Sequence, residues 1–449
     1  MPVPTPLTVL PLVDEPQTSP LDVEALFHGL FGTERAAFWL DAGADAGDGW
    51  SILGAGVIED DPDVVNAVPL GGNNSDADIR EPVVPFHGGW VGWLPYETGA
   101  AACGAPTAAS DDAPAWIAVT HAVAVDHATG GIFALGAADA VGAWRSTVAD
   151  ALETAPPLPD LPAAAGITAH ARHHVADYAA AIERCRAAIE RGDAYQLCLT
   201  TRFTSPRPDD PFTVYRRLRT ATPAHHGGYL RVGDRYLLSA SPEQFLAVER
   251  GEISTSPIKG TRPRGATPQL DAQLAEELRT DVKERAENVM IVDLMRNDLS
   301  HVGDPGSVRV DRLWQVESYP AVHQLVSTVS ARLRAGVTFG ELCEAAFPAG
   351  SMTGAPKLSA MTILHELEQG PRGVYAGCFG HVGLDGRVDL AMVIRSIVIG
   401  PDDAVVGAGG GITWLSRPDA ETAEVATKAR APLAALGVRL PDEWASLLP

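Results

Sequence analysis

The sequence predicts an α+β fold in which antiparallel strands joined by tight turns dominate and long helices lie between them. One observation is a series of apolar runs that flank short turns containing glycine, which is typical of β-hairpins. Another is a set of longer segments with apolar residues at helical spacing. Parallel strands would need long crossover connections in place of tight turns, so a doubly wound parallel sheet is not expected.

Hairpins are expected at four places along the chain. They join runs 116–126 and 132–135 around Gly130-Gly131, runs 229–232 and 236–240 around Gly233-Asp234, the two halves of 245–256 around Gly251, and runs 379–384 and 388–399 around Asp385-Gly386. The third hairpin leads directly into a Gly- and Pro-rich stretch that contains Lys259. A strand is therefore expected to deliver this lysine to its position.

Helices are expected between the hairpins and near the end of the chain. Residues 175–191 have apolar positions at helical spacing and stop at Gly192, and a strand should follow over 195–203. Two later helices are expected to carry paired glutamates. The chain therefore mixes long helices with hairpin strands, which is the α+β pattern.

The clearest break in the chain is the segment 155–166, which contains four prolines. Prolines at this density preclude a continuous helix or a central strand, so the segment is expected to be a linker. It would separate an N-terminal region, 1–154, from a catalytic region, 167–436. A short C-terminal tail, 437–449, would follow.

Composition narrows the function classes. The 449-residue chain is 46% hydrophobic, which suffices for one large domain or two. A formal net charge of −23 disfavours nonspecific binding to nucleic acid or to an anionic membrane, because both attract basic proteins. The start has no signal-peptide pattern and no apolar run approaches the roughly 18 residues of a membrane span, so a cytoplasmic location is expected. The five scattered cysteines predict neither a disulfide framework nor a zinc site.

Lys259 is the first candidate for chemistry. It lies between two prolines in the run SPIKGTRPRG, residues 256–265. A single lysine in such a loop is also explained by a structural or solvent-facing role. If it acts on a substrate, it does so as a nucleophile in the form of the neutral amine, which the site must favour.

Two pairs of glutamates are candidate metal ligands. Glu284 and Glu287 lie three residues apart, and Glu421 and Glu424 repeat this spacing on the last long helix. A spacing of three places both carboxylates on one face of a helix. Each pair alone fits a solvated helix face. Four carboxylates from two facing helices, without clustered histidines, fit a hard cation such as Mg²⁺.

Two Gly-rich segments and one arginine are candidate anion-binding features. Residues 347–357, which include Ser351, could enclose a small anionic ligand, and residues 407–412 let backbone N–H groups approach a carboxylate. Neither has the spacing of a Walker or Rossmann motif, so nucleotide binding is not expected. Arg395 lies within the apolar run 392–398, where either a ligand carboxylate or an internal acid would satisfy it.

Taken in order over 178–432, these motifs resemble the chorismate-utilising enzymes, and most closely the large component of aminodeoxychorismate synthases. The resemblance is carried by GDAYQ at 192–196, SASPE at 239–243, the Lys259 loop, the two glutamate helices, 347–357 and the glycines of 407–411, with a looser match of GGWVGWLPYE at 88–97. It implies an anthranilate synthase component I-like fold, with antiparallel sheets packed face to face and helices outside.

The resemblance also implies catalytic roles. Anthranilate synthases usually carry alanine where Lys259 stands, whereas aminodeoxychorismate synthases use this lysine as the nucleophile. Lys259 would attack C2 of chorismate while Glu243 protonates the departing C4 hydroxyl, and ammonia would then displace the lysine. Gln196 stands where isochorismate and salicylate synthases usually have lysine, so it belongs on the ammonia side. His323 matches a family histidine and is a further catalytic candidate, although a satisfied buried histidine explains it equally.

Ligand sites are implied in the same way. Mg²⁺ would be held by Glu287 and Glu424, with Glu284 and Glu421 in support through water. The remaining residues implied to bind chorismate are Gly260, Thr261, Ser351, Tyr375, Arg395, Gly409 and Gly410.

The expected product is 4-amino-4-deoxychorismate for 4-aminobenzoate and folate synthesis. No cysteine lies in a nucleophile-elbow pattern. The resemblance implies a separate glutamine amidotransferase subunit that supplies ammonia. The alternatives are an anthranilate synthase component I, an isochorismate or salicylate synthase, which Gln196 disfavours, and a non-catalytic binding subunit, which should lack one of the chemical residues. The run FWLDAG at 38–43 lacks the serine of tryptophan-binding relatives, so bound tryptophan is not expected.

Overall fold

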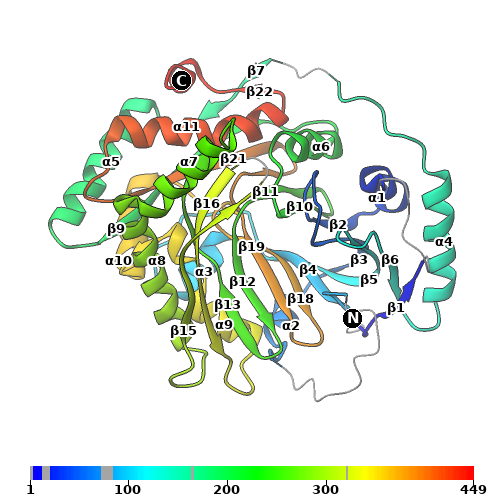
Figure 1. The fold of residues 1–449 in the computed structure, drawn as a ribbon. Helices are drawn as coiled ribbons and strands as arrows, with labels where there is room; N and C mark the ends of the chain where they lie inside the picture. Colours follow the sequence, from blue (N-terminus) through cyan, green and yellow to red (C-terminus); the bar gives the residue numbers. More distant parts are fainter. Residues whose placement is uncertain (1–3, 13–20, 72–83, 163–165, 320–321, 449) are drawn as a thin grey trace.

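A computed structural model describes residues 4–12, 21–71, 84–162, 166–319 and 322–448. Within them, twenty strands form one hydrogen-bonded network, and helices lie along its outside (Figure 1). The named strand pairs of this network are antiparallel, as the hairpin-rich sequence predicts. The predicted α+β class is therefore confirmed.

The elements of the N-terminal region precede the Pro-rich segment. They are β1 (Thr8–Pro11), α1 (Val23–Phe31), β2 (Ala36–Asp41), β3 (Trp50–Glu59), α2 (Pro62–Asn66), β4 (Gly89–Leu94), α3 (Tyr96–Ala102), β5 (Ala115–Asp126), β6 (Ile132–Gly136) and α4 (Val141–Thr154).

The elements of the remaining chain form two groups along the sequence. The first group is β7 (Ile167–Thr168), β8 (His170–Ala171), α5 (Val175–Glu190), β9 (Gln196–Pro206), α6 (Pro211–Ala221), β10 (His226–Val232), β11 (Arg235–Ser241), β12 (Gln244–Glu249), β13 (Glu252–Thr255), β14 (Ile258–Pro263), α7 (Pro268–Thr280) and α8 (Val282–Ser300). The second group is β15 (Arg309–Ser318), β16 (Val322–Arg332), α9 (Phe339–Ala346), the 3₁₀ turn η1 (Gly350–Met352), β17 (Gly354–Ala355), α10 (Lys357–Glu368), β18 (Cys378–Gly383), β19 (Val388–Met392), β20 (Ser396–Ile399), β21 (Asp403–Ile412), α11 (Pro418–Ala435), β22 (Val438–Arg439) and α12 (Asp442–Ala445).

The N-terminal and catalytic regions share this strand network. β2 pairs with β10, and β4 pairs with β18. One buried cluster accordingly contains side chains from both regions, including Phe38, Trp93, Leu230 and Phe379. The predicted linker separates the regions in sequence, but their strands and their cores are continuous.

Three predicted hairpins are confirmed, namely β5–β6, β10–β11 and β12–β13. In the last one, Arg250 and Gly251 have positive φ angles of 52° and 76°, as a tight two-residue hairpin turn requires. The fourth prediction is correct for the turn but wrong for its second strand, since 388–399 divides into β19 and β20. Arg395 lies at this break with φ of 53°, a left-handed conformation that ends an extended strand.

The two glutamate helices are confirmed as α8 and α11. The Asp281 side chain caps α8 by accepting hydrogen bonds from the backbone N–H groups of Lys283 and Glu284. Pro418 occupies the first turn of α11, where a missing N–H costs nothing. The Asp281 cap and Pro418 mark helix starts just before the glutamate pairs, so each pair lies in the first turns of its helix.

The Pro-rich segment contains neither helix nor strand over 155–162. After it, β7 pairs in parallel with β22, and Trp444 of α12 is fully buried. The C-terminal residues 437–448 therefore pack onto the catalytic region. In the described ranges, no helix combines the length and apolarity that a membrane crossing requires.

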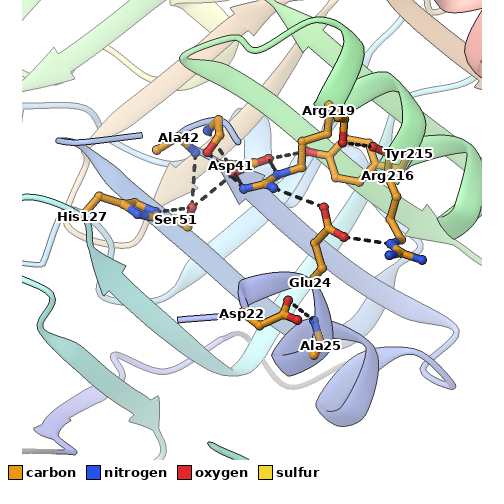
Figure 2. Close-up of polar contacts among 12 residues, drawn as sticks. Asp22, Glu24, Ala25, Asp41, Ala42, Ser51, His127, Tyr215, Arg216 and Arg219 are labelled. Carbon is orange, nitrogen blue, oxygen red and sulfur yellow. Dashed lines mark hydrogen bonds and ion pairs between the residues drawn. The ribbon is translucent and has the colours of Figure 1, made fainter. Parts of the chain in front are cut away.

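A buried network of charges fastens β2 and α1 to α6 (Figure 2). The Asp41 carboxylate accepts hydrogen bonds from Arg219 Nε at 2.5 Å and from the Tyr215 hydroxyl at 2.9 Å. Arg219 also pairs with Glu24 at 3.2 Å, and Arg216 contacts the same glutamate at 2.8 Å. The Asp41 carboxylate is thus held by internal partners.

Arg219→Met is expected to lower the free energy of unfolding by about 3 kcal/mol, because the Asp41 side chain, 1% exposed, would keep its charge and lose its cation. The matched control is Arg216→Met. Arg216 contacts no carboxylate except Glu24 among the described residues, and Glu24 would still pair with Arg219, so less than about 1 kcal/mol should be lost. Urea unfolding of both variants provides the measurement. Equal losses would show that Asp41 does not depend on Arg219.

Candidate active site

Lys259 lies on β14 and lines a cavity of about 500 Å³. β14 pairs with β16, and the pairing register shifts between Lys259 and Thr261. Gly260, between them, has φ of 75°, and a Cβ there would lie 2.7 Å from Leu278 Cδ1 on α7. The bulge therefore requires glycine, and it fixes the place at which the strand presents Lys259.

Glu243 lies in the short turn between β11 and β12 and lines the same cavity. Its side chain is buried, and burial raises the pKa of its carboxyl, while Lys259 and a hydrogen bond with Ser351 oppose the rise. The backbone carbonyl of Glu243 accepts the N–H of Met392, which ties the turn to β19. A carboxyl with a raised pKa keeps its proton to higher pH, which suits a proton donor.

Glycines of β21 form the cavity wall near Lys259. A Cβ at Gly407 would lie 2.1 Å from the Tyr375 ring, and a Cβ at Gly411 would lie 2.8 Å from Gln196 Nε2 and 3.8 Å from Lys259 Nζ. A side chain at either position would therefore collide with its neighbours or fill the cavity. The residues of β21 that line the cavity are Gly407, Ala408, Gly409, Gly410 and Gly411.

Gln196 begins β9 directly beside Gly411. It is fully buried, and in the described residues neither its amide nitrogen nor its oxygen has a hydrogen-bond partner. Buried amides are almost always paired, so two free hydrogen-bonding groups next to Lys259 need an explanation. A small polar molecule such as water or ammonia would satisfy them.

Arg395 lines the cavity from the break between β19 and β20. Burial lowers the pKa of its guanidinium, while Tyr375 and Glu424 oppose the change. In the described part of the chain no acidic side chain forms an ion pair with Arg395, which removes the internal-acid explanation there. Its fork of donors is therefore free to bind a ligand carboxylate bidentately.

Thirteen of the predicted site residues meet in this single cavity. They are Lys259, Glu243, Gly260, Thr261, Ser351, Tyr375, Arg395, Gly409, Gly410, Glu284, Glu287, Glu421 and Glu424. Residues from eight separate segments of sequence are brought together.

His323 lies outside the cavity lining. It is 1% exposed on β16, its Nε2 is 2.9 Å from Asp271 Oδ1 of α7, and its Nδ1 is 2.8 Å from the Ser318 hydroxyl. Both ring nitrogens are thus engaged with the protein. These contacts hold α7 against the sheet, which supports the alternative of a satisfied buried histidine.

Each of the four glutamates lies near a cation. Glu284 is 3.6 Å from Arg262, and Glu424 is 2.7 Å from Lys428. Burial raises the pKa of Glu287 and of Glu421. Burial acts in the same direction on Glu424, but Lys428 and other lysines hold its pKa below the usual value.

The donor set fits a hard divalent cation, since it consists of carboxylate oxygens alone. Glu287 Oε1 is buried without a hydrogen-bond partner in the described residues, as an oxygen reserved for a ligand would be. In the same ranges, no three His, Cys, Asp or Glu side chains are already arranged around one metal position. Mg²⁺ often binds through one or two carboxylates plus water, so these residues fit a site with few direct ligands.

Sequence reasoning missed two further lysines of the cavity, Lys283 and Lys428. Lys428 Nζ donates a hydrogen bond to the Gly409 carbonyl at 2.8 Å as well as pairing with Glu424. The rarity of lysine in this sequence is the signal that could have identified them. The chain has only four lysines among its 34 basic residues, and three of the four line this cavity.

Comparison with known proteins agrees with the site. Residues 48–434 match the family model described as chorismate binding enzyme. An aminodeoxychorismate synthase of Streptomyces pristinaespiralis is 40% identical over 92% of this chain, which spans 64% of that relative's length. Anthranilate synthase component 1 of Streptomyces coelicolor is 39% identical over 78% of this chain and 73% of its own. The crystal structure of anthranilate synthase component I from Streptococcus pneumoniae has a TM-score of 0.72 at 26% identity, covering 96% of this chain and 93% of the other.

Proposed function

The chain belongs to the chorismate binding enzyme family, and we propose that it converts chorismate and ammonia to 4-amino-4-deoxychorismate through a covalent bond to Lys259. Overall identity does not separate the branches of the family, because an aminodeoxychorismate synthase and an anthranilate synthase are 40% and 39% identical to the chain. The observation that carries the proposal is that Lys259 lines the cavity together with the buried carboxyl of Glu243. Gln196, whose amide has no hydrogen-bond partner in the described residues, adjoins Gly411 near Lys259.

The first step of the proposed reaction uses two of these groups. Lys259 Nζ forms a bond to C2 of chorismate, the ring double bonds shift, and the C4–oxygen bond breaks. Glu243 gives its proton to the departing oxygen, so that water leaves in place of hydroxide. The raised pKa of Glu243 supports this role, because the group must hold its proton until the bond breaks.

The second step reverses the shift of the double bonds. Ammonia bonds to C4, and the bond between C2 and Lys259 breaks. The new amino group loses a proton to Glu243, which restores both residues and leaves the enolpyruvyl arm in place. Gln196 would hold the incoming ammonia beside Lys259, since its amide groups have no other hydrogen-bond partner in the described residues. The overall change is substitution of the C4 hydroxyl by an amino group.

Substrate orientation follows from the charges of the cavity. Arg395, with backbone groups of Gly409 and Gly410, would bind the carboxylate of the enolpyruvyl arm. Glu287 and Glu424, supported by Glu284 and Glu421, would hold Mg²⁺. The bound cation would neutralise the ring carboxylate and fix its orientation.

The ammonia source, the location and the pathway are also part of the proposal. A relative named "component 1" indicates an enzyme of more than one component. A separate glutamine amidotransferase subunit would supply ammonia to this chain in the cytoplasm, for the synthesis of 4-aminobenzoate and folate. Free ammonium should replace that subunit in the assay.

Mass-resolved product analysis tests the proposed function. The purified chain is incubated with chorismate, Mg²⁺ and ammonium at alkaline pH, and products are followed together with pyruvate. Formation of 4-amino-4-deoxychorismate without pyruvate is expected. Anthranilate with an equal amount of pyruvate would instead assign the chain to the anthranilate branch, and isochorismate would assign it to the water-using branch.

Arg395→Leu is expected to raise the KM for chorismate about 10- to 100-fold, because a charge-assisted hydrogen bond to a carboxylate is worth about 1.5–3 kcal/mol. The effect on kcat should be smaller, since the contact exists before and during the reaction. Steady-state kinetics at varied chorismate separate the two constants. Arg231→Leu, on β10 and outside the cavity lining, is the matched control and should leave KM unchanged.

A further inference from the structure

Lys283 has a position that the proposed reaction does not explain. Its side chain lines the cavity, and its ammonium lies 3.6 Å from Glu287 and 3.8 Å from Glu421. It makes no hydrogen bond within the described residues at these distances, so both contacts are ion pairs alone. The ammonium thus stands among the carboxylates assigned above to a divalent cation.

The contacts of Lys283 differ from those of the other cations at this site. Arg262 pairs with Glu284, and Lys428 pairs with Glu424, so each of them touches one glutamate of the set. Lys283 instead joins Glu287 of α8 to Glu421 of α11. A divalent ion shared by the two helices would need to occupy the same space between them.

A lysine ammonium is a suitable counter-ion to be displaced when a metal binds. The Lys283 side chain is 47% exposed, so its flexible stem can turn toward solvent at low cost. The two ion pairs are 3.6 and 3.8 Å long and solvated at the lysine end, so they are weaker than direct coordination by a divalent ion, which carries twice the charge. Arginine, the more common basic residue of this chain, would bind the carboxylates through bidentate hydrogen bonds from its planar guanidinium and would be harder to displace.

We propose that Lys283 is a displaceable counter-ion, which neutralises the carboxylate cluster when no metal is bound and is expelled by a divalent cation. The inference deepens the proposed function, because it rests on the proposed metal site. It also requires that metal binding be weaker than the four carboxylates alone would give, since each binding event must displace the ammonium.

The test is metal binding by the whole purified chain, measured without substrate. Isothermal titration with Mg²⁺ and with Mn²⁺ is compared for the unmodified chain and for Lys283→Gln. The Kd is expected to fall roughly three- to tenfold in the variant, because two weak ion pairs no longer compete. The melting temperature in EDTA should fall by roughly 1–2 °C, because the carboxylates then repel one another without a counter-ion.

Two further variants keep the result interpretable. Arg285→Gln removes the same charge two residues along α8, but Arg285 stacks on Trp314 and does not line the cavity, so the Kd should stay unchanged. Lys283→Arg keeps the charge beside the carboxylates and should not tighten binding. A Kd for Lys283→Gln that is unchanged or weaker overturns the proposal. Equal tightening in Arg285→Gln would overturn it as well, because net charge alone would then explain the effect.

The product assay separates this inference from the proposed function. The unmodified chain could form 4-amino-4-deoxychorismate normally while the Kd for the metal is the same with and without Lys283. That result would overturn only the counter-ion role. Absence of divalent binding by the unmodified chain would overturn both the metal site and the counter-ion role, while leaving Lys259 chemistry to be judged by its product.

Discussion

Replacing Lys259 by alanine is expected to reduce the formation of 4-amino-4-deoxychorismate at least about 10³-fold. The lysine supplies the nucleophile of the proposed first step, and in the described structure no other amine lies beside Gln196 and Gly411. Ammonia would then have to attack chorismate directly. Initial rates with saturating chorismate and ammonium, followed by mass-resolved product analysis, give the measurement.

A second measurement distinguishes a lost nucleophile from a damaged fold. Unmodified protein incubated with chorismate and Mg²⁺, but without ammonium, should accumulate an adduct on Lys259 with the mass of chorismate less one water. The alanine variant should show no adduct, yet chorismate should still raise its melting temperature, because Arg395 and the glycine wall remain. An active alanine variant, or an adduct elsewhere, would contradict the proposed intermediate.

Glu243→Gln is expected to reduce kcat about 10²- to 10⁴-fold, which is the usual contribution of a general acid. The amide keeps the size of the side chain but has no acidic proton to give to the departing oxygen. Glu249→Gln is the matched control, since this glutamate lies on the same hairpin with an exposed side chain. Its kcat should equal that of the unmodified chain, and a similar loss in both variants would remove Glu243 from the mechanism.

The pH dependence gives Glu243 a distinctive signature. Burial raises the pKa of its carboxyl above 4.5, so the folded chain holds this proton to higher pH than an unfolded chain does. The contribution of Glu243 to catalysis should therefore be present below its raised pKa and be lost as the pH rises through it. In Glu243→Gln that limb of the kcat/KM profile should disappear. The variant should also be no less stable at pH 8, because it no longer buries an ionised carboxylate.

Much of the fold was predictable because its signals are local. The turn at Gly251 demands two residues with positive φ, and the sequence offers a glycine between alternating apolar runs. The helices with Glu284 and Glu421 begin at residues whose side chains or rings suit a helix start. Such features depend on neighbours in sequence, so they can be read before the structure is known.

The rest depended on contacts between distant segments. The left-handed conformation of Arg395 breaks an apolar run that looks like one strand. The run 388–399 contains no glycine or proline that would predict this break. Lys283 directly precedes Glu284 on α8, so in the sequence it looks like one member of a solvated charge pattern. Its bridge to Glu421 exists only because α8 and α11 both line the same cavity. For His323, the bonds to Asp271 and Ser318 likewise arise from tertiary packing.

The pairing of β21 with β9 has a consequence for how the molecule is made. These strands lie about two hundred positions apart in sequence, and β2 finds its partner β10 at a similar remove. Long-range antiparallel pairing slows folding, because a large loop must close before any contact compensates its entropy. The glycine wall comes from one of the last strands to leave the ribosome. A nascent or truncated chain that ends before β21 would contain Lys259 and Glu243 yet have no cavity in which they could meet.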